Sequence, residues 1–347
     1  MNVASPPPAT TLAAKDYASD QEIRWCPGCG DYAILKAVQK TLAKLEAKPE
    51  NTVFVSGIGC AARFPYYLAT YGFHTIHGRA PAFATGIKLA NPALDVWVVS
   101  GDGDALSIGG NHVLHLVRRN VNLQFLLFNN EIYGLTKGQY SPTSRIGTRS
   151  PSTPEGSLET PVSAALFALG AGARFVARSV DTLQAHLPVV LEAAQKHQGT
   201  SFVEILQNCI VYNDKAFAQV TDKVRAPDAQ IHVVHGQPLT FGKDNGKGLR
   251  IKPGTLELEV IDLSEGQFGP EDCLVHDQTD RTLATLLAGL EPPAFPVALG
   301  VLYCNPEEAL EVSAKAARPE TQRSRSERDD LAALLRNGHT WSVPLDS

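Results

Sequence analysis

Short apolar runs that stop at turn residues recur along residues 50–210. Four of them are Thr52–Gly57, Leu94–Ser100, Val121–Phe128 and Ser201–Leu206. A short apolar run bounded by glycine or asparagine is typical of a strand that is buried on both faces of a parallel sheet. The pattern therefore predicts four central strands.

Between these runs, apolar residues recur at the three-to-four spacing of an amphipathic helix. The segments are Asp31–Leu42, His112–Arg119 and Leu183–Lys196, and Asp31 is expected to cap the first of them. Strand, helix and strand in repetition indicate an α/β fold with a doubly wound, mostly parallel sheet.

Residues with metal-binding or phosphate-binding chemistry follow directly after the predicted strands. They are Cys60, Gly101-Asp102-Gly103, Asn129-Asn130 and Cys209. In open α/β sheets, ligands bind beyond the carboxyl ends of the strands. We therefore expect these residues to meet at one edge of the sheet.

The pattern divides the chain into three parts: an N-terminal arm over residues 1–19, the α/β domain over residues 20–215, and a C-terminal region over residues 216–347. The C-terminal region mixes glycine turns with strand-like runs such as Leu256–Ile261. Residues 318–330 are charged and predict a solvated or disordered linker, and Leu331–Leu335 predicts a short amphipathic helix.

Composition and charge exclude several classes of protein. At 347 residues, of which 44% are hydrophobic, the chain can bury one large core or build two domains. The formal net charge of −5 gives no electrostatic basis for binding nucleic acid. No apolar run reaches the roughly 18 residues that a membrane-spanning helix needs, and the N-terminus does not read as a signal peptide. We therefore expect a cytoplasmic protein that binds neither nucleic acid nor membrane.

The sequence Gly101-Asp102-Gly103, together with Asn130, offers ligands for a magnesium diphosphate. Mg²⁺ prefers hard oxygen ligands, and Asp102 offers a carboxylate, Asn130 an amide oxygen and Ile132 a backbone carbonyl. Glycines let backbone N–H groups approach a phosphate, and Ser107–Gly110 is expected to open a helix toward the anion. Either motif alone is more simply an ordinary turn, but the two together favour the metal site.

Six cysteines raise the question of a metal or redox site. Cys26 and Cys29 form a C-x-x-C motif with no predicted strand before it, which argues against a thioredoxin-like pair. A zinc site would normally show a second close pair of ligands, whereas Cys60 and Cys209 are each single. Four thiolates from distant segments suit an iron–sulfur cluster, although buried thiols near a cofactor are an alternative for the two single cysteines. The remaining two are expected to be structural thiols: Cys273 and Cys304.

Motifs that occur in a fixed order over roughly residues 20–290 are Trp25-Cys-Pro-Gly-Cys-Gly30, Gly57-Ile-Gly-Cys60, Thr75-Ile-His-Gly-Arg79, Gly101-Asp-Gly-Asp104 and Asn129-Asn-Glu-Ile-Tyr-Gly-Leu-Thr-Lys-Gly-Gln139. Together they resemble the β subunit of the 2-oxoacid:ferredoxin oxidoreductases, and most of all the two-subunit type that includes 2-oxoglutarate oxidoreductase. Ala61-Ala62-Arg63 stands where this family often has serines and a lysine, and Ile210 stands where it often has proline. The tail beyond about residue 295 is longer than the resemblance leads us to expect, and it has no assigned role.

The resemblance implies three cofactors, namely thiamine diphosphate, Mg²⁺ and one [4Fe-4S] cluster. It assigns the cluster ligands as Cys26, Cys29, Cys60 and Cys209, and the Mg²⁺ ligands as Asp102, Asn130 and the carbonyl of Ile132. Further cofactor contacts implied in this way are Ile58, Gly59, His77, Gly101, Gly103, Asp104, Gly134, Leu135 and Thr136. Arg63, Arg79 and Lys137 are candidates for contact with the reacting groups.

The family reaction is the oxidative decarboxylation of a 2-oxoacid with coenzyme A, which yields an acyl-CoA and CO₂ and reduces ferredoxin. It is reversible, so it can also fix CO₂, as in a reductive tricarboxylic acid cycle. The resemblance implies an α subunit that carries the glutamate needed beside the pyrimidine ring of the cofactor. The chain is therefore expected to be inactive alone and to act in an αβ heterodimer or an (αβ)₂ assembly.

The substrate is expected to be 2-oxoglutarate, whose second carboxylate needs a cation. Arg63 suits a planar carboxylate better than Lys137 does, because the guanidinium can bind both oxygens; Arg63 as a plain surface charge is the alternative. Other readings of the chain are a pyruvate or other 2-oxoacid enzyme, a non-redox thiamine diphosphate decarboxylase or synthase, and a metal-stabilised scaffold protein.

Overall fold

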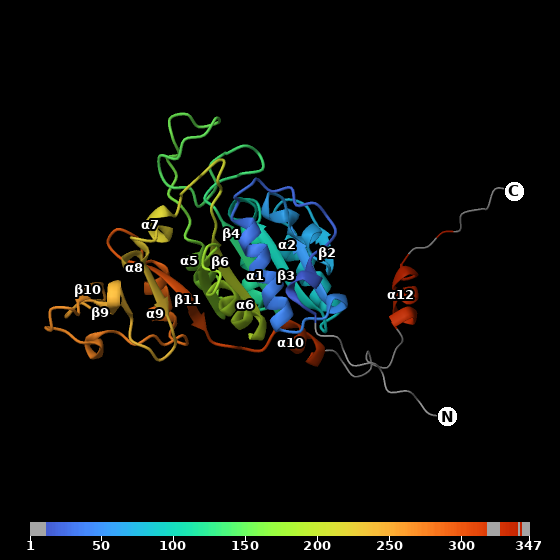
Figure 1. The fold of residues 1–347 in the computed structure, drawn as a ribbon. Helices are drawn as coiled ribbons and strands as arrows, with labels where there is room; N and C mark the ends of the chain where they lie inside the picture. The colour runs from blue at the N-terminus through green and yellow to red at the C-terminus, as the bar shows by residue number, and fades with distance from the viewer. Residues whose placement is uncertain (1–11, 318–326, 339–340, 342–347) are drawn as a thin grey trace, which may run out of the picture.

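The centre of the computed structural model, which describes residues 12–317, 327–338 and 341, is an eight-stranded sheet of order β2-β1-β3-β4-β6-β5-β11-β7 (Figure 1). Its strands are β1 (Thr52–Ser56), β2 (Tyr71–His74), β3 (Asp95–Gly101), β4 (Leu123–Asn129), β5 (Phe175–Val180), β6 (Thr200–Leu206), β7 (Gln230–Val233) and β11 (Val297–Cys304). β11 is antiparallel to β5 and parallel to β7, and every other neighbouring pair is parallel. The predicted mostly parallel sheet is confirmed.

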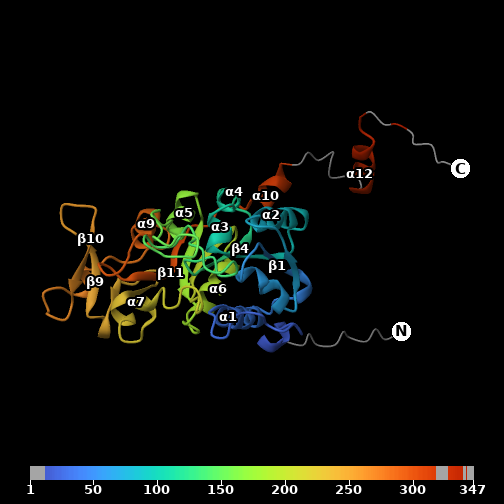
Figure 2. The same ribbon diagram turned by 90° about the horizontal axis from the view of Figure 1, so that it is seen from above.

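Helices cover both faces of this sheet (Figure 2). One face carries α1 (Asp31–Lys44) and α6 (Leu187–Lys196); the other carries α2 (Ala80–Ala90), α4 (Gly110–Arg119), α5 (Ala164–Gly170) and α9 (Arg281–Ala288). Successive strand residues alternate between the two cores: in β3, Val96 and Val98 pack on the α2 and α4 side, whereas Trp97 and Val99 pack on the α1 side. Because these strands are buried on both faces, they carry apolar side chains on both, and the sequence therefore shows continuous apolar runs.

The predicted elements of the α/β region are confirmed with small shifts. The four predicted strands are β1, β3, β4 and β6, and the three predicted helices are α1, α4 and α6. α6 begins at Leu187 rather than at Leu183, and Pro188 stands in its first turn, where a missing N–H costs nothing. The capping role expected of Asp31 is wrong, because Gly30 is the N-cap and the Asp31 side chain is buried at the first helical position.

Two of the strands that the pattern did not predict, β5 and β2, carry polar or exposed residues. β5 contains Arg178, which forms a buried ion pair of 2.7 Å with Glu204 of β6. β2 lies at the edge of the sheet, and all four of its residues are exposed. An apolar run is the signal of a buried strand, and neither segment provides one.

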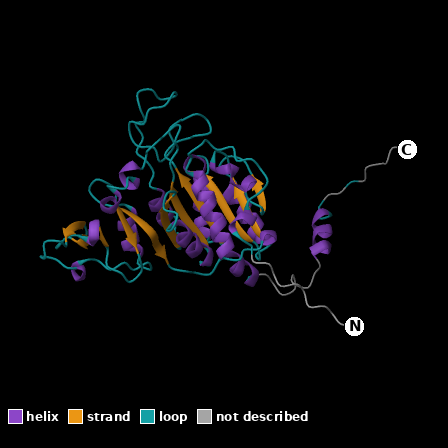
Figure 3. Ribbon diagram, in the orientation of Figure 1, coloured by secondary structure: helices purple, strands orange, loops and turns teal. Residues whose placement is uncertain are grey.

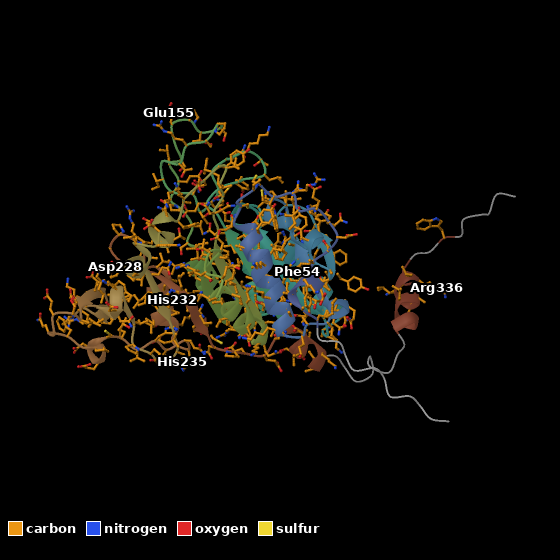
Figure 4. The ribbon with its side chains drawn as sticks, in the orientation of Figure 1. Phe54, Glu155, Asp228, His232, His235 and Arg336 are labelled. Atoms are coloured by element: carbon orange, nitrogen blue, oxygen red, sulfur yellow. The ribbon has the colours of Figure 1, made fainter. Side chains whose placement is uncertain are left out.

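The central sheet extends beyond the boundary expected at residue 215, because β7 and β11 both belong to it. His232 on β7 and Phe54 on β1 mark two well-separated parts of the sheet (Figure 4). The segment beyond residue 295 therefore begins with a core strand. Between β7 and β11 the chain forms a small antiparallel sheet of β8 (Thr240–Phe241), β9 (Lys247–Ile251) and β10 (Leu258–Asp262), which includes the predicted run near Leu256–Ile261.

The two ends of the chain differ in part from expectation. Tyr17, inside the expected N-terminal arm, is fully buried, and its hydroxyl donates to the carbonyl of Ala47 at 2.5 Å. α12 spans Glu327–Leu335, so the helix predicted at Leu331 begins four residues earlier, within the expected linker. The rest of that linker, residues 318–326, lies outside the described residues.

Among the described residues, no helix is long and apolar enough to cross a membrane.

The loops that follow the strands gather at one edge of the sheet (Figure 3). The longest of them, residues 130–163, connects β4 to α5 without a helix or strand and includes the exposed Glu155 at its outer end (Figure 4). This edge is where the chemistry predicted from the sequence was expected.

Candidate active site

A cavity of about 460 Å³ opens where β1, β3 and β4 end. Thirteen of the predicted cofactor and metal residues line it: Ile58, Gly59, Cys60, His77, Gly101, Asp102, Gly103, Asp104, Asn130, Ile132, Gly134, Leu135 and Thr136. We call it the cofactor cavity. The expectation that the strand ends converge is met.

Asp102 is the buried acid of the cofactor cavity. Its Oδ2 accepts hydrogen bonds from the hydroxyls of Ser141 at 2.5 Å and Thr143 at 2.6 Å. Burial raises the pKa of this carboxyl, while the two hydroxyls act to lower it. The hydroxyls also fix the direction of the carboxylate, and a bound cation would favour its charged form.

Two neutral oxygens accompany Asp102 in the same cavity. The amide oxygen of Asn130 accepts from the backbone N–H of Ile132 at 3.2 Å, and it retains a second lone pair. The carbonyl of Ile132 accepts no hydrogen bond from any residue that the structure describes. A carboxylate, an amide oxygen and a free carbonyl are hard ligands of the kind that Mg²⁺ prefers, so these residues fit the predicted metal.

Gly103 and Tyr133 join the loop after β3 to the loop after β4. The Tyr133 hydroxyl donates to the carbonyl of Gly103 at 2.8 Å. A Cβ added at Gly103 would lie 2.3 Å from Cε1 of the Tyr133 ring, so only glycine allows this contact.

Asp104 connects three segments around the cavity. Its Oδ1 accepts from the backbone N–H of Ile58 at 3.0 Å and of Gly78 at 2.7 Å, and it lies 2.7 Å from Nδ1 of His77. Its Oδ2 accepts from the Ser100 hydroxyl at 2.5 Å. With its oxygens used in this way, Asp104 positions the walls of the cavity and is not placed as a metal ligand.

A second, smaller cavity of about 40 Å³ lies beside the first and is lined by the four predicted cluster ligands, Cys26, Cys29, Cys60 and Cys209. We call it the sulfur pocket. Four residues line both it and the cofactor cavity: Asp31, Cys60, Asn130 and Gly134. A Cβ added at Gly134 would lie 3.5 Å from the Sγ atoms of both Cys60 and Cys209, so a single thin wall separates the two spaces.

The C-x-x-C segment is held by a tight turn. The N–H of Cys29 donates to the carbonyl of Cys26 at 3.0 Å, and Gly28 has a φ of +84°. Proline followed by a glycine of positive φ is the pattern of a type II turn. Trp25, the preceding residue, donates from Nε1 to the carbonyl of Cys60 at 2.7 Å, which joins this turn to the third cysteine.

The thiols of Cys29 and Cys60 are protonated in the absence of a metal. Burial, and then the nearby Asp31, raise the pKa of Cys60 to about 12 and also raise the pKa of Cys29. Metal binding would reverse this, because a coordinated thiol loses its proton.

The donor set of the sulfur pocket bears on which metal fits it. Four cysteines from three separate segments of the chain line the pocket. Four thiolates suit an iron–sulfur cluster, which binds each of them at a different iron. Cys273 and Cys304 do not line the pocket.

Comparison with known proteins decides the family. The C-terminal TPP binding domain of thiamine pyrophosphate enzymes matches residues 57–205. A 2-oxoglutarate oxidoreductase subunit KorB of Mycobacterium tuberculosis is 50% identical over 339 residues, which cover 95% of this chain and 88% of that protein. The chain belongs to the β subunits of the 2-oxoacid:ferredoxin oxidoreductases. It is thus a subunit of a thiamine diphosphate oxidoreductase, as the motifs predicted.

Two further relatives support this placement. Subunit β of 2-oxoacid:ferredoxin oxidoreductase 1 from Aeropyrum pernix is 50% identical over 198 residues, covering 57% of this chain and 62% of that one. The structure of 2-oxoglutarate:ferredoxin oxidoreductase from Magnetococcus marinus, with 2-oxoglutarate, coenzyme A and succinyl-CoA bound, matches with a TM-score of 0.73 at 31% identity, over 94% of this chain and 96% of that one. Because the M. tuberculosis match covers 95% of the chain, the long tail is largely shared with that relative.

The three basic residues that are candidates for contact with the reacting groups lie in different places. Arg63 lines a cavity of about 410 Å³ that adjoins the cofactor cavity at Ile58, Gly59 and Leu135. Arg79 instead donates to the carbonyls of His77 and Ile108, and Lys137 is exposed at a φ of +77°. None of the three lines the cofactor cavity, but Arg63 lines a space that adjoins it, and Arg79 and Lys137 line neither.

Several functional residues were not found from the sequence. Ser141 and Thr143, which orient Asp102, lie in the irregular loop after β4 and carry no periodic signal. Asp31 lines both cavities, but its place before a helix suggested a cap. The helix expected to open at Ser107–Gly110 is present, because α4 begins at Gly110. These four residues do not line the cofactor cavity, however; the first residues of α3 (Asp102–Leu106) line it instead.

Gly103→Ala is expected to weaken thiamine diphosphate binding. The added methyl displaces the Tyr133 ring, and overpacking of this kind costs about 1–3 kcal/mol, which corresponds to roughly 5- to 150-fold in affinity if the whole cost falls on cofactor binding. Calorimetric titration of the αβ complex with cofactor and Mg²⁺ measures it. Gly110→Ala is the matched control, since an added Cβ there meets nothing within 4 Å. Equal affinity in the Gly103 variant and the wild type would contradict the role of this glycine.

Proposed function

We propose that this β subunit holds thiamine diphosphate and Mg²⁺ in the cofactor cavity and one [4Fe-4S] cluster in the sulfur pocket. With an α subunit it converts 2-oxoglutarate and coenzyme A to succinyl-CoA and CO₂ and passes the electrons to ferredoxin. The observation that carries the proposal is the shared wall, in which Asp31, Cys60, Asn130 and Gly134 line both spaces. Thiamine diphosphate and the cluster, bound on the two sides of this wall, would lie close enough for direct electron transfer.

The residues of this chain have separate tasks in the reaction. When bound, thiamine diphosphate supplies the electron-accepting centre that decarboxylation of a 2-oxoacid requires. Asp102, Asn130 and the carbonyl of Ile132 would hold Mg²⁺, which neutralises the diphosphate. Asp104 fixes the loops that form the cavity wall. The four cysteines would hold the cluster behind Gly134.

The partners belong to the same proposal. Relatives are named as subunits of larger enzymes, which supports an α subunit in an αβ or (αβ)₂ assembly. The bound coenzyme A of the M. marinus enzyme supports the same acyl acceptor here. Ferredoxin as electron acceptor follows from the names of the relatives, and the reverse reaction would fix CO₂. Six free cysteines are consistent with a reducing cytoplasm.

The substrate is proposed from two observations. Relatives from M. tuberculosis and Methanothermobacter thermautotrophicus are named for 2-oxoglutarate. Arg63 lines the space next to the cofactor cavity and has no ion-pair partner among the described residues. A guanidinium without an ion-pair partner is suited to the second carboxylate of 2-oxoglutarate, which pyruvate lacks.

Replacing any of Cys26, Cys29, Cys60 and Cys209 with serine is expected to lower the iron content and abolish ferredoxin reduction, because a cluster ligand is lost. Cys273→Ser and Cys304→Ser are the matched controls and should retain full iron. Iron analysis and absorbance near 400 nm of the anaerobically purified αβ complex provide the measurement. Full iron in Cys209→Ser would remove that residue from the ligand set.

Asp102→Ala is expected to abolish Mg²⁺-dependent binding of thiamine diphosphate, since the metal would face the diphosphate without its charged protein ligand. Asn130→Ala removes only a neutral ligand and should weaken binding less. Cofactor affinity measured with and without Mg²⁺ distinguishes the two variants. If Asp102→Ala binds the cofactor as the wild type does, the metal assignment fails.

Arg63→Ala is expected to cost about 2–4 kcal/mol in kcat/KM for 2-oxoglutarate if the contact is desolvated. Turnover of pyruvate or 2-oxobutyrate, which have no second carboxylate, should change much less. Arg24→Ala is a useful comparison because Arg24 lines the same space but is exposed and paired with Glu22 at 2.8 Å. An equal loss of kcat/KM for 2-oxoglutarate and for pyruvate would show that Arg63 does not bind the second carboxylate.

A further inference from the structure

Gln207 reaches into the sulfur pocket and has no role in the reaction described so far. It follows β6 directly, is 1% exposed and lines the pocket together with the four cysteines. Its backbone N–H donates to the carbonyl of Asn129 at 2.8 Å, which holds it against the end of β4. Its position is therefore set by the central sheet.

The orientation of the Gln207 side chain is determined by its neighbours. Nε2 donates to the carbonyl of Asn208 at 2.9 Å, so the nitrogen and not the oxygen must point to this side. The same nitrogen lies 3.3 Å from Sγ of Cys29, and its second proton is available to that sulfur. The chain thus points an amide N–H at a predicted cluster ligand.

Folding stability does not explain this placement. Oε1 of Gln207 is buried and has no hydrogen-bond partner among the described residues. A buried oxygen without a partner is unfavourable. An apolar side chain of similar length would avoid that cost, so the amide is retained at some expense to stability.

The residue after the C-x-x-C motif makes room for Gln207. A Cβ added at Gly30 would lie 2.9 Å from Cγ of Gln207 and 2.0 Å from Oδ2 of Asp181. Asp181 in turn accepts from the backbone N–H of Asn208 at 2.9 Å, which holds the residue whose carbonyl accepts from the Gln207 amide. Glycine at position 30 therefore permits both contacts beside Cys29.

We propose that Gln207 is a positioning residue that sets the reduction potential of the cluster by donating an N–H···S hydrogen bond to Cys29. The inference rests on the cluster proposed above. Reduction adds negative charge that is shared by the ligand sulfurs, so a donor to sulfur stabilises the reduced form more than the oxidised form. The hydrogen bond therefore raises the potential, and burial strengthens the effect.

The direction of this effect matters for the enzyme. A cluster with a higher potential accepts electrons more readily from the cofactor side, while one with a lower potential passes them more readily to ferredoxin. Gln207 would hold the cluster at a value that allows both steps. Its removal should favour electron donation to ferredoxin over acceptance from the cofactor.

The test uses Gln207→Met and Gln207→Leu in the anaerobic αβ holoenzyme, with the midpoint potential followed by electron paramagnetic resonance. At a fixed ambient potential, the ratio of reduced to oxidised cluster should fall about tenfold in both variants, a shift of about 59 mV to more negative potential for a one-electron couple. Iron content should stay at the wild-type level. Gln184→Met is the matched control. Among the residues that the structure describes, Gln184 also has a buried oxygen without a partner, and its amide donates to the carbonyls of Ala33 and Asp181 and to no sulfur.

The possible results separate this inference from the proposed function. Full iron with an unchanged midpoint potential in both Gln207 variants would overturn the inference and leave the cluster standing. Loss of iron in both variants would show that Gln207 only maintains the loop, which also overturns it. An equal shift in Gln184→Met would show that the effect is not specific to the sulfur contact. A wild-type complex without iron would overturn the cluster and the inference together.

Discussion

Neighbouring parallel strands have their carboxyl ends at the same edge of the sheet, and β1, β3, β4 and β6 are such neighbours. Three of these strand ends supply the cofactor cavity, and the first and last of the four also supply Cys60 and Cys209 to the sulfur pocket. The C-x-x-C turn comes from elsewhere in the chain, and Trp25 joins it to the carbonyl of Cys60. The proximity of the two proposed redox centres is thus a result of sheet topology.

The same edge gathers acidic groups that have no ion-pair partner among the described residues. Asp102 is buried in the cofactor cavity, and Asp31 is buried between the two cavities. Burial, with a contribution from Asp181, raises the pKa of Asp31 to about 7. A buried carboxylate without a partner cation is unfavourable. Mg²⁺ and iron would supply the missing positive charge, so the bound cofactors should also stabilise the fold.

The sequence predicts this edge well because the signals there are local. Apolar runs mark β1, β3, β4 and β6, and the residues after them, such as Cys60 and Asp102, carry recognisable chemistry. Contacts made across distant segments could not be predicted in this way. Gln207 beside Cys29, and Ser141 and Thr143 on Asp102, depend on how separate loops meet in space. β5 was missed because it contains the buried, charged Arg178. β7 and β11 were not assigned to the central sheet because they lie far along the chain from its other strands.

The most direct test of a shared wall between the two centres is to add 2-oxoglutarate alone to the anaerobic αβ complex and follow the cluster by freeze-quench electron paramagnetic resonance. Without coenzyme A or ferredoxin, electrons released at the proposed cofactor would have the proposed cluster as their nearest acceptor. A reduced-cluster signal should therefore appear together with the release of CO₂. Release of CO₂ with no change in the cluster signal would contradict direct electron transfer across Gly134 and the residues around it.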